Sequence, residues 1–301
     1  HVGDIEIGKV LLLSIANQSV LNSEGLQPKL SGPSGKGKTH AAKAMFHLVP
    51  DVGYKLEGSL SAKSLFYHPD LAPGTVVFSD DIRMNADLED TLKRAMSNFQ
   101  QKTTHMTVSK DRASQTLDIP ERITWWLTSV DSQYSDELLN RLFGLDVDDS
   151  VGQDEAVTRQ QLERAKHGDL DLPEDEDVKV CRAIIHEVKK RLYTVIIPYS
   201  DMIEWKGTSD RRNLPRFLDL IKGYAVMRFM KMQEIFDGEI LASPGDFDDA
   251  KALYELGIVG LTTKLTKAEL RLVTWMALKK PLSINYIVKG YLKPGGGQYT
   301  T

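Results

Sequence analysis

The chain has 301 residues, of which 41% are hydrophobic and 27% charged, with a net charge of −4 and an isoelectric point near 6.0. These values exclude a uniformly basic protein that coats nucleic acid, so any nucleic-acid site must be a local cluster of cations. The single cysteine, Cys181, excludes an internal disulfide and is expected to be a small buried side chain. No apolar run approaches the ~20 residues of a membrane span. We therefore expect a cytoplasmic protein.

The pattern of apolar residues over the first half of the chain predicts an α/β core. Short β-prone runs alternate with segments in which apolar residues recur at helical spacing, which is typical of a parallel sheet covered by helices. The expected elements, in chain order, are a helix over 4–21, a strand over 27–30, a helix over 39–49, a strand and short helix within 53–66, a strand over 75–78, a helix over 86–99, a β-hairpin over 103–119 and a strand over 123–127.

The second half is predicted to be helical, with no strands beyond about residue 150. Helices are expected over 178–194, 213–231 and 246–257, and a capping box at Thr266 opens a further helix. The first residues carry neither methionine nor a signal-peptide pattern, so we expect a preceding domain in a longer protein. The predicted organisation is a core over 1–150, a helical lid over 151–258 and the start of a small helical module over 259–301.

The clearest motif is a glycine-rich turn that matches G-x-x-x-x-G-K-[ST] between a predicted strand and a predicted helix. Its glycines let backbone N–H groups point at phosphate oxygens, and the following helix adds the positive end of its dipole. Lys38 is expected to reach the β- and γ-phosphates of ATP, and the Thr39 hydroxyl to bind Mg²⁺. The predicted nucleotide-binding residues are Gly32, Pro33, Ser34, Gly35, Lys36, Gly37, Lys38, Thr39 and His40.

Acidic and hydroxyl side chains follow the next strands. Asp80 and Asp81 end an apolar run, where Asp80 is expected to hold Mg²⁺ and Asp81 to orient or deprotonate the attacking water. Ser129, at the end of a later strand, is a candidate for a hydrogen bond to that water or to the γ-phosphate. The neighbouring Thr128 is an equal alternative.

Over nearly its whole length the chain resembles the MCM-like AAA+ helicases carried by bacterial mobile elements and phages. The resemblance is carried by the segments 57–66 (EGSLSAKSLF), 138–143 (LLNRLF) and 212–214 (RNL). It implies that Arg141 is an arginine finger, that Arg212 is the sensor-2 residue, with Arg211 as its rival, and that a partial winged helix follows 259. Asp81 stands where many AAA+ proteins have glutamate, and no asparagine stands at the sensor-1 position.

The hairpin at 103–119 is the feature that favours a helicase. AAA+ helicases with an insertion at this point direct its tip into a central channel, and here Lys110 and Arg112 lie at the predicted tip. Such cations bind a phosphate backbone without reading bases. The favoured function is therefore a hexameric, ATP- and Mg²⁺-dependent DNA helicase that acts in the replication of a mobile element. The alternatives are an initiator or helicase loader that uses ATP as an assembly switch, and a protein-remodelling machine, although the latter usually has an aromatic residue at its pore.

Overall fold

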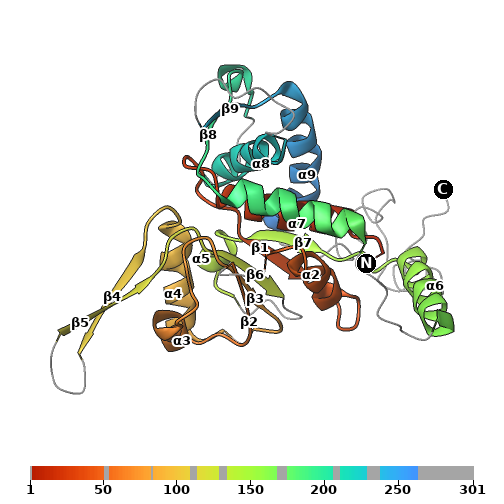
Figure 1. Cartoon of the computed structure of the whole chain (residues 1–301), viewed down its shortest axis with the longest axis horizontal. Helices are drawn as coiled ribbons and strands as arrows, with labels where there is room; N and C mark the ends of the chain where they lie inside the picture. Colours follow the sequence, from red (N-terminus) through yellow and green to blue (C-terminus); the bar gives the residue numbers. More distant parts are fainter. Residues whose placement is uncertain are drawn as a thin grey trace, which may run out of the picture.

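A five-stranded sheet with parallel pairing throughout forms the centre of the molecule (Figure 1). The computed structural model describes residues 2–50, 54–82, 84–108, 114–128, 134–167, 175–205, 211–228 and 238–263. The strands, in their order across the sheet, are β2 (Lys55–Glu57), β3 (Val76–Ser79), β6 (Thr124–Thr128), β1 (Pro28–Ser31) and β7 (Phe143–Asp146).

Both faces of this sheet are buried at β3 and β6, which explains why these two strands are largely apolar. Successive side chains of a strand point to opposite faces, so Trp126 packs into one hydrophobic cluster with Phe78 while Trp125 packs into the other with Val77. Both tryptophans are fully buried. The helices of this part of the chain are α1 (Ile5–Asn17), α2 (Lys38–Phe46), α3 (Ala62–Tyr67), α4 (Ala86–Ser97) and the short α5 (Asp136–Leu139).

The C-terminal helical region packs on the first of these faces. Helix α8 lies against α1 so closely that a Cβ added to Gly223 would stand 2.9 Å from the side-chain nitrogen of Asn17. Lys189 also joins the two parts, because its ammonium donates to Gln18 Oε1 at 2.6 Å and to the carbonyl of Gly74 at 2.8 Å. The elements of this region are α7 (Glu176–Lys189), β8 (Thr194–Ile196), a 3₁₀ turn (Ser200–Met202), α8 (Asn213–Met227), β9 (Glu239–Leu241) and α9 (Pro244–Thr263).

Several expectations for the second half of the chain were wrong. Strands do occur beyond residue 150, since β8 and β9 pair in parallel as a two-stranded sheet. Each has only three residues, too few to show a period, and the partners lie more than forty residues apart. Helix α6 (Val151–His167) was not predicted either, because its side chains are mostly exposed and it has no apolar stripe.

Two further differences concern the same region. Cys181 is exposed rather than buried, because α7 turns Ile185 and Val188 toward the core and Cys181 toward solvent. Helix α9 extends to Thr263, beyond the helix expected over 246–257, and residues 264–301 of the module expected over 259–301 lie outside the described residues. In the part of the chain that is described, no helix is both long and apolar enough to cross a membrane.

The hairpin predicted over 103–119 is confirmed as β4 (Thr103–Val108) and β5 (Ser114–Ile119), two antiparallel strands in continuous register. It projects away from the sheet as a two-stranded ribbon (Figure 1). A ring contact between His105 and Phe66 of α3, with centroids 5.0 Å apart, holds one face of the hairpin. The other face carries Met106 and Val108, which are 76% and 66% exposed.

Candidate functional site

The glycine-rich turn links β1 directly to α2 at the carboxyl edge of the sheet. Gly35 and Gly37 have φ angles of 78° and 92°, a conformation that side chains other than glycine rarely adopt. A Cβ at either position would meet no atom within 4 Å, so the space beside both glycines is open. The turn, with Pro33 and Ser34 at its start, and the amino end of α2 therefore form a cradle that suits an anion of phosphate size.

Lys38, the first residue of α2, points back into this turn. Its ammonium donates to the carbonyl oxygens of Gly32 and Pro33 at 2.9 and 3.0 Å, and the residue is only 6% exposed. These bonds hold a positive charge within the curl of the backbone. The cradle thus combines N–H donors, the helix dipole and one fixed cation.

Thr39, Asp80 and Thr128 meet beside the cradle because the strands before them end at the same edge of the sheet. Thr39 Oγ1 donates to the two carboxylate oxygens of Asp80 at 2.8 and 3.0 Å, and Thr128 Oγ1 lies 2.5 Å from Asp80 Oδ1. One hydroxyl and one carboxylate facing a phosphate cradle are the protein ligands that Mg²⁺ uses when phosphates and waters fill its other positions. The donor set therefore fits Mg²⁺.

Asp81 lies next to this cluster with an exposed side chain and a φ of 43°. Its backbone N–H donates to Thr128 Oγ1 at 3.1 Å, so the single hydroxyl of Thr128 contacts both acidic positions. Backbone conformations of this kind concentrate at functional sites, where the surrounding structure maintains them. Of the two alternatives left open by the sequence, Thr128 contacts the acids, and Ser129 lies outside the described residues.

Replacing Thr128 by valine, which keeps the shape but removes the hydroxyl, is expected to lower ATP turnover by roughly tenfold or more, because an unsatisfied group would remain beside Asp80 and Asp81. Binding of a fluorescent ATP analogue should change little, since the cradle and Lys38 are intact. The comparison variant is Ser129→Ala. If Ser129→Ala loses turnover and Thr128→Val does not, the assignment of the hydroxyl is reversed.

Lys36 and His40 lie on the flank of the turn that faces α6. The Lys36 ammonium is 2.5 Å from the Asp154 carboxylate of that helix. Burial lowers the pKa of the His40 imidazole, and the positive charge of Arg164 lowers it further. The α6 helix thus contacts the turn through charged side chains.

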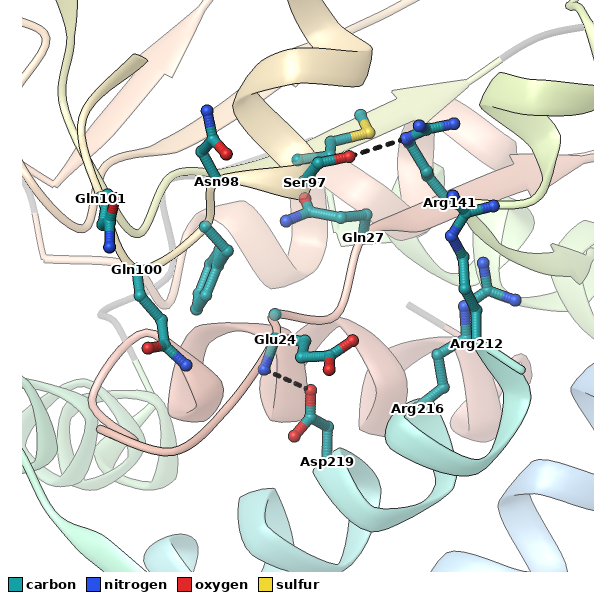
Figure 2. A pocket seen from close by; sticks show the side chains of 13 residues that line it. Glu24, Gln27, Ser97, Asn98, Gln100, Gln101, Arg141, Arg212, Arg216 and Asp219 are labelled. Carbon is teal, nitrogen blue, oxygen red and sulfur yellow. Dashed lines mark hydrogen bonds between the residues drawn. The ribbon is translucent and has the colours of Figure 1, made fainter. Parts of the chain in front are cut away.

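A second polar site lies at the opposite, amino edge of the sheet. It is a cavity of about 470 Å³ between the end of α4, the residues before β1 and the start of α8. Arg141, Arg212 and Arg216 line one side of it, and Gln100 and Gln101 lie across from them (Figure 2). We call this cavity the arginine pocket.

The charges of the arginine pocket are arranged at an electrostatic cost. Burial lowers the pKa of Arg141, and the nearby positive charge of Arg212 lowers it further. Arg212 and Arg216 also lie at the amino end of α8, where the helix dipole disfavours cations and the first turn contains no acidic residue. The carboxylates of Glu24 and Asp219 also line the pocket, but three guanidinium groups gather on one side of it, and that side is a candidate anion site.

Arg141 is held in place by α4 and α5. Its Nε donates to Ser97 Oγ at 3.0 Å, and a terminal nitrogen donates to the carbonyl of Glu137 at 2.5 Å. Arg141 lies two residues before Phe143, the first residue of β7, whereas the glycine-rich turn follows β1, the neighbour of β7 in the sheet. Because a four-residue parallel strand spans about 13 Å, the arginines and the phosphate cradle of one chain lie at opposite ends of the sheet.

The structure therefore brings Lys38, Thr39, Asp80 and Thr128 together, and separately brings Arg141 and Arg212 together. Arg216 was not predicted from the sequence, although its spacing of four residues from Arg212 places it on the same face of the helix. The predicted hairpin cations Lys110 and Arg112 lie outside the described residues.

A glycine-rich turn between a parallel strand and a helix, with a carboxylate at the tip of a nearby strand, defines the class of P-loop nucleotide-binding proteins. Residues 1–191 match the family model described as the MTBMA_p00010 P-loop domain, and the chain belongs to that family. Comparison with curated proteins found no match.

Proposed function

We propose that this chain is the motor subunit of a ring-forming AAA+ ATPase that resembles the MCM-like helicases, and that it moves along DNA during replication of a mobile element. The observation that carries this proposal is the separation of the phosphate cradle from the arginine pocket across the sheet. Such a chain can complete one nucleotide site only if a second copy presents its arginines to the cradle. If the rotation between neighbouring copies divides a full turn evenly, repetition of that head-to-tail contact closes a ring. We expect six copies in this ring.

Within one copy, the cradle would bind the phosphates of ATP. Lys38 would leave the carbonyls of Gly32 and Pro33 for the β- and γ-phosphate oxygens, while Thr39 and Asp80 would hold Mg²⁺, directly or through water. The ion would neutralise charge on the phosphates. Asp81 would orient or deprotonate the attacking water, and Thr128 or Ser129 would keep that water and the acids in line.

The neighbouring copy would supply Arg141 as the finger and Arg212 as a reader of the γ-phosphate. Arg211 precedes it and, like Arg212, is exposed, so it remains a rival. An arginine delivered from a neighbour supplies the positive charge that one phosphate loop lacks as the γ-phosphate leaves ADP. It also makes hydrolysis dependent on the relative position of the two subunits, which is how chemistry would drive motion.

The β4–β5 hairpin would transmit this motion to DNA. It projects from the body (Figure 1), and Lys110 and Arg112 stand in the sequence between its two strands. Cations on a projecting ribbon contact phosphates of any sequence, which suits a translocating enzyme. The exposed side chains of Met106 and Val108 leave one face of the ribbon available for further contacts.

The hairpin is tested by replacing Lys110 with alanine. Basal ATPase activity is expected to remain, while stimulation by single-stranded DNA and strand displacement fall by roughly tenfold or more, because a phosphate contact at the moving tip is lost. Lys102→Ala is the matched control: Lys102 lies at the base of the hairpin, where its ammonium is 2.7 Å from Asp118. An unwinding rate that Lys110→Ala leaves unchanged would remove the hairpin from the mechanism.

Strand displacement by the wild type also separates a helicase from an initiator or loader. A chain that binds duplex DNA and hydrolyses ATP but separates no strands would fit the assembly-switch alternative. ATPase activity stimulated by proteins and not by DNA would fit a remodelling machine.

A further inference from the structure

Arg216 contacts the residues next to Arg141 and Arg212, the two arginines that we propose act on the nucleotide of a neighbouring copy. Its guanidinium donates to Asn213 Oδ1 at 3.1 Å and to the carbonyl oxygen of Asn140. Asn213 directly follows Arg212, and Asn140 directly precedes Arg141. Arg216 is only 7% exposed as a residue, and its planar guanidinium links the start of α8 to the segment that carries Arg141.

Arg216 occupies a position that the helix dipole does not favour for a cation. Burying a guanidinium requires that its lost hydration be replaced, and a cation in the first turn of a helix opposes the helix dipole. Arg228, at the other end of α8, has the opposite position relative to the helix dipole. It lies at the carboxyl end, where the dipole favours a cation, and it pairs with the carboxylates of Asp246 and Asp249.

We infer that Arg216 is a positioning residue that fixes Arg141 and Arg212 relative to one another, so that a copy presents both to the nucleotide of its neighbour. Figure 2 shows the three arginines along the same side of the pocket. The inference rests on the proposed function, since it concerns the shared ATP site. Lysine cannot replace Arg216, because one compact ammonium lacks the planar fork that reaches two acceptors on different segments.

The test uses mixed assemblies in which one subunit can only donate arginines. Lys38→Ala subunits cannot hydrolyse ATP but retain the arginine pocket, and Arg141→Ala subunits retain the cradle but lack the finger. Mixing them should restore ATPase activity. A Lys38→Ala donor that also carries Arg216→Lys is expected to restore roughly ten- to a hundredfold less, because a displacement of about 1 Å in a catalytic group has an effect of that size.

Arg228→Lys in the same donor is the matched control, since it weakens a structural arginine on the same helix and should leave the recovery unchanged. In the otherwise wild-type chain, Arg216→Lys should reduce kcat while affinity for a fluorescent ATP analogue is retained, because the cradle is distant.

The outcomes separate the two ideas. If the unmodified donor restores activity and the Arg216→Lys donor restores as much, the positioning role is overturned and the shared site stands. Equal losses in the Arg216→Lys and Arg228→Lys donors would also overturn it, by showing a general effect on α8. If the unmodified donor restores nothing, the shared site fails, and the role of Arg216 fails with it.

Discussion

Replacing Lys38 by alanine is expected to abolish ATP hydrolysis and to weaken nucleotide binding severely. The Lys38 ammonium is the cation that the glycine-rich turn holds within its curl, bonded to Gly32 and Pro33. Without it, the β- and γ-phosphates would meet backbone N–H groups alone. Isothermal titration with ATP and a steady-state phosphate-release assay measure the two effects.

The matched control for this prediction is Lys43→Ala. Lys43 lies further along the same helix with its ammonium 2.9 Å from Glu57, and more than half of its side chain is exposed. Its loss should change stability and activity little, because exposed ion pairs contribute at most about 1 kcal/mol. Full hydrolysis by Lys38→Ala would mean that the turn is not the nucleotide site.

Replacing Arg141 by alanine is expected to leave nucleotide binding intact and to lower turnover by roughly 10³- to 10⁵-fold, the range of effect attributed to arginine fingers. Binding is retained because Arg141 lies at the amino edge of the sheet, away from the cradle of its own chain. Arg191→Ala is the control, since Arg191 lies over the ring of Tyr193 and does not line the arginine pocket. Nucleotide titration and ATPase rates distinguish the two variants.

Mixing the Arg141→Ala variant with the Lys38→Ala variant tests directly whether Arg141 acts on the nucleotide of a neighbouring copy. In a head-to-tail ring of equal parts Arg141→Ala and Lys38→Ala subunits, about a quarter of the interfaces pair an intact cradle with an intact finger. Activity should therefore reappear on mixing two nearly inactive preparations. If the mixture stays as inactive as its components, Arg141 does not act across an interface.

Strands β3 and β6 of the central sheet could be predicted to within one residue, because most of their residues are apolar and that signal is local. Strand β7 (Phe143–Asp146) was not predicted, since Gly144 and Asp146 interrupt its apolar residues. The short strands β8 and β9 could not be predicted either, since the pairing of Thr194 with Glu239 depends on tertiary packing. Helix α6 escaped prediction for a different reason. Its exposed side chains give no period, and its charged contact with Lys36 has no sequence signature.

The phosphate cradle could be anticipated because parallel strands bring their carboxyl ends to one edge, so Thr39 and Asp80 had to lie close together. The arginine pocket could be anticipated only in part. The family resemblance indicated Arg141 and Arg212, but their proximity results from α8 packing on α1, which joins segments some two hundred residues apart. The bond from Arg216 to Asn140 depends on the same packing.

The central claim is that adjacent copies share each nucleotide. The most direct measurement is an image of the particles formed with a non-hydrolysable ATP analogue and single-stranded DNA. We predict a closed ring in which Arg141 and Arg212 of one copy face the γ-phosphate in the cradle of the next, with the β4–β5 hairpins around the central opening. A chain that remains monomeric, or a ring whose arginine pockets face solvent, would contradict the claim.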